Sequence, residues 1–207
     1  FASLIENIEK KCNGHIGTGL IGGQWLLQTL TRGGRADLAW RIATNRDYPS
    51  WGYMADHGAT TVWELWNGDT ADPAMNSHNH VMLVGDLTTW LYEDVAGIRT
   101  DPQHPGFKRL VMHPQTVPGL DFCKASYRTM YGTVVSEWER HARGFRWRIR
   151  LPAQTAATIA VPASDAAKVR EGAGPAASSP GVRFIKAESG RVLYEIGAGS
   201  YEFVGEP

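Results

Sequence analysis

The sequence predicts an α+β chain in two parts, a helical part followed by an antiparallel β-sandwich. Up to about residue 97, apolar residues recur at intervals of three and four, as on the buried face of a helix. Beyond residue 98 the period changes to two, and turn-forming residues separate the short alternating segments, which is typical of β-sandwiches. The sequence therefore predicts two domains, residues 1–97 and 98–207. The clearest alternating residues are Phe145, Trp147, Ile149 and Leu151.

Three helices are predicted before residue 48. The first covers residues 2–11 and ends at Asn13-Gly14, which tolerate the left-handed conformation at a helix C-terminus. The second follows Thr18, which we expect to cap it, and stops at Gly33-Gly34. The third covers about residues 35–45. Residues 17–23 are rich in glycine, but no predicted strand precedes them and no Lys-Ser/Thr pair follows them, as a phosphate loop would require. We therefore interpret these glycines as sites of tight helix packing rather than as a nucleotide site.

A fourth helix is predicted from residue 78 to about residue 95, with Ser77 as its cap. An inward stripe is expected at helical intervals. This places His80 at the buried N-terminal end, where it could donate to a ligand hydroxyl, orient a carboxylate, or be a core histidine. His78 and His80 are two residues apart and would point in different directions, which argues against a paired metal site. The expected stripe consists of His80, Val84, Leu87 and Leu91.

Short strands are expected throughout the second part, with a hairpin turn at residues 141–144 and a mobile loop at residues 172–181. Arg146, Arg148 and Arg150 lie on one face of a strand. We interpret them as a solvated outer face that discourages edge aggregation, in preference to a binding patch. The expected strands cover about residues 110–113, 122–128, 134–140, 145–151, 157–161, 182–186, 192–196 and 201–204.

Composition excludes several classes of partner. Lys and Arg together number 21, as do Asp and Glu, so no net charge attracts nucleic acid or an anionic membrane, and we expect neither as a partner. A neutral polyhydroxylated substrate is compatible with that balance. Cys12 and Cys123 are expected to be free buried thiols rather than a disulfide. The start at Phe1 suggests a cut within a longer protein, which leaves the compartment open, cytoplasmic or secreted.

The most informative stretch is residues 48–67, which has neither a helical nor a strand period. It holds Trp51, Trp63 and Trp66, and Glu64 lies between two of these indoles. Large rings are costly to expose to water. We therefore interpret the stretch as a long ordered connection whose rings form a pocket wall, with Glu64 pointing into the pocket.

Glu64 has two interpretations. Flanked by indoles, its carboxylate would be partly desolvated, which raises the pKa of a carboxyl and suits it to proton transfer near neutral pH. Aromatic planes also stack on the apolar faces of sugars, while a carboxylate binds their hydroxyls. The alternative is a glutamate held by a backbone amide beside core tryptophans, because structural networks also perturb carboxylates.

Four motifs carry a resemblance to a known family. They are Tyr-Pro-Ser-Trp-Gly-Tyr at residues 48–53, Gly-Ala-Thr-Thr-Val-Trp-Glu-Leu-Trp at 58–66, Ser-His-Asn-His at 77–80 and Pro-Gly-Phe-Lys-Arg at 105–109. In order and spacing they resemble the C-terminal part of the α-L-rhamnosidases of glycoside hydrolase family 78, over about residues 15–151. The resemblance implies the last helices of an (α/α)₆ toroid followed by an appended β-sandwich.

The resemblance also implies site roles. Glu64 would be the general base that activates water for inverting hydrolysis of a terminal α-L-rhamnosyl residue. Asn79 and His80 would offer hydrogen bonds to the sugar. Stacking and positioning walls would come from Trp51, Trp63 and Trp66. No metal or other cofactor is implied.

The family's general acid lies upstream of this sequence, and inverting hydrolysis requires two carboxyl groups. We therefore expect a fragment that is inactive alone and that needs the upstream part of the same enzyme or self-association into a homo-oligomer. Asp56, Asp69 and Asp72 could substitute as acids, but their polar, turn-like contexts favour the ionised form. Two other functions remain open. One is a non-catalytic carbohydrate-binding module, and the other is a structural accessory domain whose aromatic stretch is core.

Overall fold

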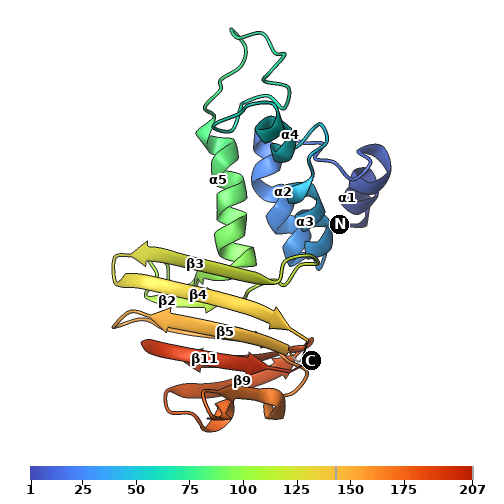
Figure 1. Cartoon of the computed structure of the whole chain (residues 1–207). Coiled ribbons are helices and arrows are strands. Elements are labelled where there is room, and N and C mark those ends of the chain that lie inside the picture. The colour runs from blue at the N-terminus through green and yellow to red at the C-terminus, as the bar shows by residue number, and fades with distance from the viewer. Residues whose placement is uncertain (143, 207) are drawn as a thin grey trace. The chain divides into compact units, whose positions relative to one another are not determined.

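The computed structural model describes residues 1–142 and 144–206, and among these it leaves out the side chains of residues 20 and 81–85. Two compact units are present (Figure 1). The helical unit comprises Phe1–Leu91 with Thr116–Pro118, and the sandwich unit comprises Tyr92–Gln115 with Gly119–Pro207. The chain is thus a helical end followed by two β-sheets, as the sequence predicts.

The helical unit contains the three predicted early helices and two later ones. Asn13 and Gly14, both at positive φ, follow the first of these segments, as expected. Gly34, also at positive φ, follows the second. The helices are α1 (Ala2–Glu6), which continues as the π-helix η1 (Asn7–Lys11), then α2 (Leu20–Arg32), α3 (Ala36–Thr44), α4 (Trp51–Asp56) and α5 (Val81–Trp90), which continues as the π-helix η2 (Leu91–Val95).

The core of the helical unit lies between α2, α3 and α5. Leu30 of α2 and Leu38 of α3 are almost completely buried. Trp90, at the end of α5, is also buried, and its indole N–H donates to Thr31 Oγ1 of α2 over 2.8 Å. Trp40 of α3 packs against the same indole with ring centres 6.3 Å apart. Leu30 and Leu38 thus lie on buried faces of their helices, whereas Ile21 and Trp25 of α2 are exposed.

The predicted helix starts are wrong at two places. Gly19, and not Thr18, is the N-cap of α2, so this helix has no side-chain cap at its N-cap position. The last helix begins three residues later than expected, with His80 as its N-cap, because Ser77 Oγ accepts from Asn79 N within the preceding loop. Leu91 is 39% exposed, so it does not belong to an inward stripe. Val84 lies outside the described side chains.

The aromatic stretch is only partly a connection, because it begins with helix α4. Ser50 Oγ accepts a hydrogen bond from Tyr53 N over 2.9 Å, which is an N-cap of the usual kind. Gly52 is required at its position, since a Cβ there would lie 2.3 Å from the carbonyl oxygen of Asn45. This close approach brings the start of α4 against the end of α3.

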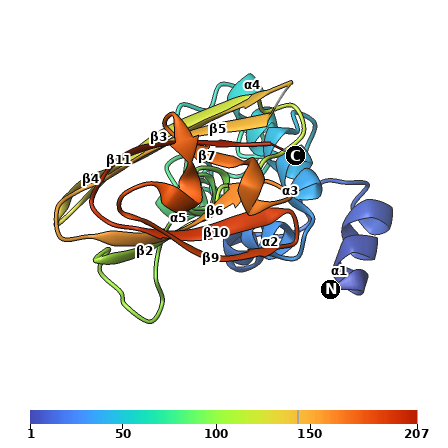
Figure 2. The same cartoon turned by 90° about the horizontal axis from the view of Figure 1, so that it is seen from below.

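The sandwich unit has a five-stranded sheet, β1-β2-β6-β10-β9, and a six-stranded sheet, β3-β4-β5-β11-β7-β8, which form two layers in Figure 2. Strands β2 and β6 pair in parallel, so the predicted antiparallel pattern fails at that one pair among the described strands. The strands are β1 (Ile98–Thr100), β2 (Arg109–Met112), β3 (Phe122–Thr129), β4 (Gly132–His141), β5 (Gly144–Leu151), β6 (Ala156–Pro162), β7 (Val169–Glu171), β8 (Gly174–Pro175), β9 (Val182–Glu188), β10 (Arg191–Ile196) and β11 (Gly199–Gly205).

A buried hydrogen-bond network joins the six-stranded sheet to the chain that precedes β1. Ser136, on the inner face of β4, donates to Ala96 O over 2.7 Å and accepts from Trp147 Nε1 over 2.9 Å. Trp138 donates to Val95 O over 2.9 Å. Both indoles are 1% exposed or less. Buried polar groups are costly unless they are paired, and these five groups are all paired within the network.

Two loop predictions have different outcomes. His141 pairs with Gly144 in the register of β4 and β5, as a hairpin requires, while Arg143 lies outside the described residues. Residues 172–181 are not the featureless loop that their composition suggests, because they hold β8 and the 3-10 helix η4 (Ala176–Ser178). Ala176 is completely buried, which fixes this segment.

Both cysteines are free thiols, as predicted, and both are partly buried. Burial raises the pKa of Cys123 to about 11. No helix in the described part of the chain is long and apolar enough to span a bilayer. Within that same part, no group of three or more His, Cys, Asp and Glu side chains is placed to hold a metal ion.

Candidate functional site

The loop between α4 and α5 folds back on itself and pairs residues 61–65 with residues 76–80 (Figure 1). His80 N donates to Val62 O and Glu64 N donates to Ser77 O, each over 2.8 Å. Leu65 N donates to the side-chain Oδ1 of Asn76 over 3.1 Å. We call residues 61–65 and 76–80 the paired loop. It brings the two motifs of the site, separated in the sequence by the excursion of residues 66–75, side by side.

Glu64 is held by this pairing. Its Oε2 accepts a hydrogen bond from Ser77 N over 3.0 Å and lies 3.9 Å from His80 Nδ1. The Glu64 side chain is 43% exposed, so the expected enclosure between two indoles is wrong for this chain. Trp63 and Trp66 turn away from the carboxylate into contacts of their own. The paired loop thus presents an anchored carboxylate to solvent.

His80 is the partly buried partner of that carboxylate. Its side chain is 17% exposed, and its Nε2 is buried without a hydrogen-bond partner among the described residues. At 3.9 Å, Nδ1 is beyond direct hydrogen-bond distance of Glu64 Oε2 but within the range of an ion pair when His80 is protonated. His80 therefore faces Glu64 with Nδ1, while its second ring nitrogen, Nε2, is buried.

The tryptophans support the loop from its interior side. Trp51 and Trp63 are 8% and 5% exposed, respectively. Trp66 is half-buried, stands edge-on to Trp51 with ring centres 5.2 Å apart, and donates its indole N–H to Thr18 O over 3.0 Å. These contacts make the indoles part of the framework behind the paired loop. Sugar stacking on any of them stays a prediction.

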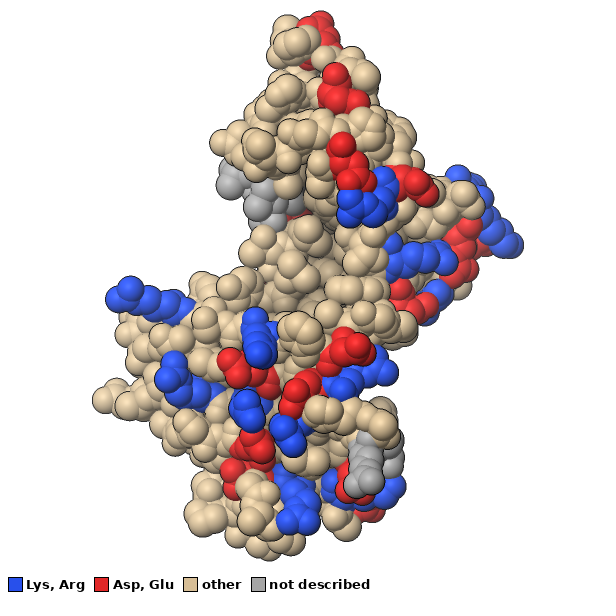
Figure 3. All heavy atoms as spheres, in the orientation of Figure 1, with Lys and Arg blue, Asp and Glu red and all other residues tan. Residues whose placement is uncertain are grey.

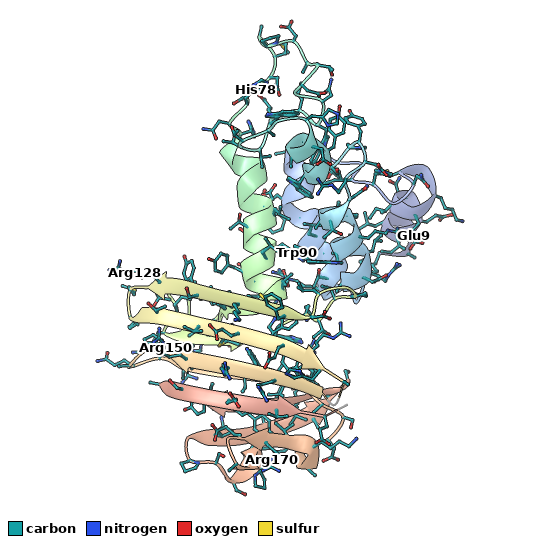
Figure 4. All side chains as sticks on the ribbon, in the orientation of Figure 1. Glu9, His78, Trp90, Arg128, Arg150 and Arg170 are labelled. Carbon is teal, nitrogen blue, oxygen red and sulfur yellow. The ribbon has the colours of Figure 1, made fainter. Side chains whose placement is uncertain are left out.

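Trp63 is fixed on both sides. Its ring lies against His78, with ring centres 5.7 Å apart, and a Cβ at Gly68 would lie 2.7 Å from the indole. His78 Nε2 in turn lies 3.1 Å from Gly68 O (Figure 4). His78 therefore belongs to the packing around Trp63. Residues 78–80 precede α5, so the helical spacing argument for the two histidines does not apply.

Asn79 is exposed at the end of the paired loop, where its backbone N–H donates to Ser77 Oγ over 3.2 Å. Trp51 lines a hollow of about 270 Å³ with Met54 and Leu87, and Glu64 is not among its lining residues. The structure thus brings Glu64, Asn79 and His80 together on one loop, whereas Trp51 lines a hollow with Thr61 and Val62 of that loop and not with Glu64.

The alternative acids predicted from the sequence are engaged locally. Asp56 pairs with Arg46. Asp69 accepts from the Tyr53 hydroxyl over 3.0 Å, and Asp72 Oδ1 accepts from Ala74 N over 2.9 Å. Each of these three carboxylates is thus already engaged by a partner of its own.

Sequence reasoning missed two residues of interest. Asn76 ties the two halves of the paired loop together, and only its place one residue before the Ser-His-Asn-His motif could have suggested this. Asp86 lies on α5, six residues after His80 and so about 9 Å along the helix axis. Burial raises the pKa of the Asp86 carboxyl, and its Oδ2 is buried without a partner in the described structure. A lone carboxylate in the apolar run of residues 81–90 is the signal that was available.

The comparisons with known proteins agree with this geometry. Residues 2–95 match the model of the bacterial alpha-L-rhamnosidase 6 hairpin glycosidase domain, and residues 97–175 match that of the bacterial alpha-L-rhamnosidase C-terminal domain. The chain belongs to the bacterial α-L-rhamnosidase family. It corresponds to the C-terminal portion of these proteins, as the motifs around Glu64 and His80 imply.

Individual relatives cover the same span. An alpha-L-rhamnosidase of Streptomyces avermitilis is 33% identical over 97% of this chain, which spans 19% of that relative. The structure of an alpha-L-rhamnosidase from Dictyoglumus thermophilum aligns with this chain with a TM-score of 0.87 at 32% identity. The alignment covers 100% of this chain and 23% of the Dictyoglumus thermophilum chain. The structure of a Streptomyces avermitilis alpha-L-rhamnosidase complexed with L-rhamnose aligns with a TM-score of 0.84 at 31% identity. The alignment covers 95% of this chain and 19% of the Streptomyces avermitilis chain. The chain thus spans about a fifth of the length of these relatives.

Proposed function

We propose that this chain is the part of an inverting α-L-rhamnosidase that carries the general base, Glu64, and that hydrolysis of a terminal α-L-rhamnosyl residue needs an acid from the upstream part. The observation that carries the proposal is the anchored carboxylate. Glu64 accepts from Ser77 N at 3.0 Å, lies 3.9 Å from His80 Nδ1 and remains open to solvent. A general base that acts on water needs this combination of fixed geometry and access.

In the proposed reaction, Glu64 removes a proton from a water molecule as the water oxygen bonds to the anomeric carbon. The glycosidic bond breaks at the same carbon, and the leaving oxygen takes a proton from a second carboxyl group. Inverting enzymes hold the two carboxyl groups about 6.5–9.5 Å apart to admit the water. Asn79 and His80 would donate hydrogen bonds to sugar hydroxyls.

The framework of the site has a supporting role in this proposal. The Ser77 amide fixes one oxygen of Glu64, which leaves the other oxygen to face water. Trp51, Trp63 and Trp66 hold the loop from behind, so we assign them positioning first and stacking on the sugar second. Residues 1–97 would be the end of the six-hairpin catalytic domain, and residues 98–207 the appended sandwich.

The partners follow from the same proposal. The substrate would be a rhamnosylated glycoside, and the upstream part of the same enzyme would complete the helical domain. Self-association of the chain is a second way to cover its exposed apolar side chains, among them Ile21 at 76% and Trp25 at 58% exposed. The equal numbers of acidic and basic residues support neither nucleic acid nor an anionic membrane as a partner.

A second candidate function is that of a non-catalytic or structural accessory domain. The burial of Trp51 and Trp63 and the backbone amide on Glu64 favour it, because both belong to the structural interpretation of the aromatic stretch. Under this alternative, Glu64 only fixes the paired loop. Its removal would then affect folding and leave the chemistry of the whole enzyme unchanged.

Hydrolysis of an aryl α-L-rhamnoside separates the two. We expect turnover by the full-length enzyme, none by this chain alone, and loss of nearly all turnover in full-length Glu64→Gln, which keeps the size and the acceptor oxygen. NMR of the first product should show the inverted anomer. Activity of the Glu64→Gln enzyme close to wild type would support the accessory function and refute the assignment of the base.

A further inference from the structure

The outer face of the six-stranded sheet carries a groove that the proposed function does not use. A hollow of about 280 Å³ lies over β3, β4 and β5, and a second, of about 570 Å³, lies over β4, β5 and β11. Glu137 and Arg148 line both hollows. We call these two neighbouring hollows, taken together, the sheet groove. Because neighbouring strands lie about 4.8 Å apart, a ligand that spans both hollows would cross four strands, or about 14 Å, which suits a chain molecule better than a single small one.

The strand register arranges polar side chains in rows across this groove. Glu139 of β4 stands opposite Arg146 of β5, and Glu137 stands opposite Arg148. Arg148 is in turn opposite Glu202 of β11. Figure 3 shows acidic and basic side chains interleaved over this face, and Figure 4 labels Arg150, which lies on β5 with Arg146 and Arg148. Donors and acceptors therefore alternate along the groove.

These side chains are fixed by one another while they remain accessible. Arg146 donates to Glu139 over 3.1 Å, and Arg148 donates to Glu202 over 2.7 Å. The exposed fractions of the four side chains lie between 40% and 58%. Mutual pairing of this kind limits rotamer freedom, which lowers the entropy lost when a ligand binds. The groove therefore offers preorganised hydrogen-bonding groups to solvent.

The charges select a class of ligand. The first hollow is lined by four cationic side chains, including Arg146 and Arg148, and by three carboxylates, including Glu137 and Glu139. A phosphate or a polyanion would meet those carboxylates, and an apolar ligand would strip water from every ion pair. A neutral polyol can donate to the carboxylates and accept from the guanidinium groups at once.

An aromatic ring stands at one end of the groove. Phe122, at the start of β3, is 59% exposed and lines the first hollow. Lys124 Nζ lies 6.0 Å from the ring centre, which places a donor beside an apolar plane. An exposed ring next to hydrogen-bonding groups suits the C–H face and the hydroxyls of one sugar residue.

We infer that the sheet groove binds a neutral oligosaccharide, with Phe122 stacking on one sugar ring and Arg148 and Glu137 binding hydroxyls further along. The inference rests on the proposed function in taking the ligand to be part of the glycan substrate. In the sandwich unit this site would hold a longer substrate on the enzyme, independently of Glu64. The competing explanation is a solvated face whose ion pairs only prevent edge aggregation.

Calorimetric titration of this chain, carrying Glu64→Gln, tests the inference. The probes are L-rhamnose, an α-linked tetramer of L-rhamnose, glucuronate and inorganic phosphate. We expect saturable binding of the tetramer, weaker binding of the monomer, and no competition by the two anions. Phe122→Ala should weaken tetramer binding about 2- to 10-fold. Arg148→Ala should weaken it roughly tenfold, because it removes charge-assisted hydrogen bonds.

Matched controls lie on the other sheet. Phe184 is 43% exposed and Arg183 pairs with Glu195, so Phe184→Ala and Arg183→Ala remove the same chemical groups from outside the groove. Both should bind the tetramer as wild type. Circular dichroism of each variant checks that it is folded. Absence of tetramer binding, equal effects of the groove and control variants, or tighter binding of either anion would overturn the inference.

The outcomes also separate this inference from the proposed function. Phe122→Ala in the full-length enzyme should leave hydrolysis of a small aryl α-L-rhamnoside at the wild-type rate. Normal hydrolysis without any groove binding would defeat only the inference. Tetramer binding that depends on Phe122 and Arg148, in an enzyme that does not hydrolyse rhamnosides, would defeat only the proposed function.

Discussion

Asn76→Ala tests whether the paired loop positions Glu64. The Asn76 side chain accepts from Leu65 N over 3.1 Å, next to the two hydrogen bonds that join Glu64 to Ser77 over 2.8 and 3.0 Å. The variant therefore removes one of three neighbouring bonds between the halves of the loop. A single bond of this kind contributes about 0.5–1.5 kcal/mol.

That free energy sets the expected loss of activity. If the loop must be paired for Glu64 to act, the displaced population rises and kcat falls by about 2- to 10-fold, since 1.4 kcal/mol is a factor of ten. KM should change less than kcat, because in the proposed reaction Glu64 acts on water rather than holding the substrate. The assay is steady-state hydrolysis of an aryl α-L-rhamnoside by the full-length enzyme.

Two further variants make the test specific. Asn76→Asp keeps the acceptor oxygen but adds a negative charge near Glu64. Because the acceptor oxygen for Leu65 N is retained, kcat should recover toward the wild-type value. Asn67 bonds Thr70 in the same loop excursion, so Asn67→Ala is the control and should keep kcat within about twofold. An equal loss in Asn67→Ala, or wild-type kcat in Asn76→Ala, would refute the positioning role.

Three predictions concern stability. Ser136→Ala leaves the indole N–H of Trp147 and the carbonyl of Ala96 unpaired in the core. Urea unfolding of the sandwich should therefore show a free energy of unfolding lower by about 2–4 kcal/mol. A decrease of less than about 0.5 kcal/mol would contradict the network. Burial raises the pKa of Asp86, so the folded state binds the proton more tightly and stability is lost as pH rises above about 3.8. Asp86→Asn should therefore unfold at higher temperature than wild type at neutral pH, which a thermal melt checks. Burial, then the charges of Arg191 and Arg99, lower the pKa of His113 from 6.5 to about 4. The folded state therefore resists protonation of His113, and the free energy of unfolding should fall by up to about 3 kcal/mol as the pH drops from 6.5 to about 4. His113→Gln should flatten that dependence in urea titrations at several pH values.

Periodicity predicted the elements because it reports burial directly. Trp147 and Ile149 alternate with arginines and are buried, as a two-residue period requires. Helix starts were predicted less well. A hydroxyl residue before an apolar run is a cap only if its side chain reaches the first turn, and Ser77 instead bonds Asn79 within the paired loop. Such competition between local hydrogen bonds is not visible in sequence spacing.

Partners distant in the sequence were the hardest to predict. Hydrophobic alternation gives the face of a strand but not its neighbour, so the parallel pairing of β2 with β6 carries no local signal. The same holds for the site. Motif order placed Glu64 and His80 near each other, yet their approach depends on the backbone pairing of Val62 with His80. Composition misled at residues 172–181, where a single buried side chain, Ala176, is enough to order the segment.

The paired loop has a consequence for where this chain can vary in length. Its two halves are fixed to each other on the near side of the excursion, and Trp66 and Gly68 are anchored as well. Asp69 is also anchored, because it accepts from the Tyr53 hydroxyl over 3.0 Å. Residues 70–75 form the tip beyond these anchors, where Met75 is 71% exposed. A tip closed at its base can be lengthened, shortened or exchanged at small entropic cost. Residues 70–75 should therefore tolerate insertions and exchanges better than the paired loop, because the hydrogen bonds that hold Glu64 lie outside them.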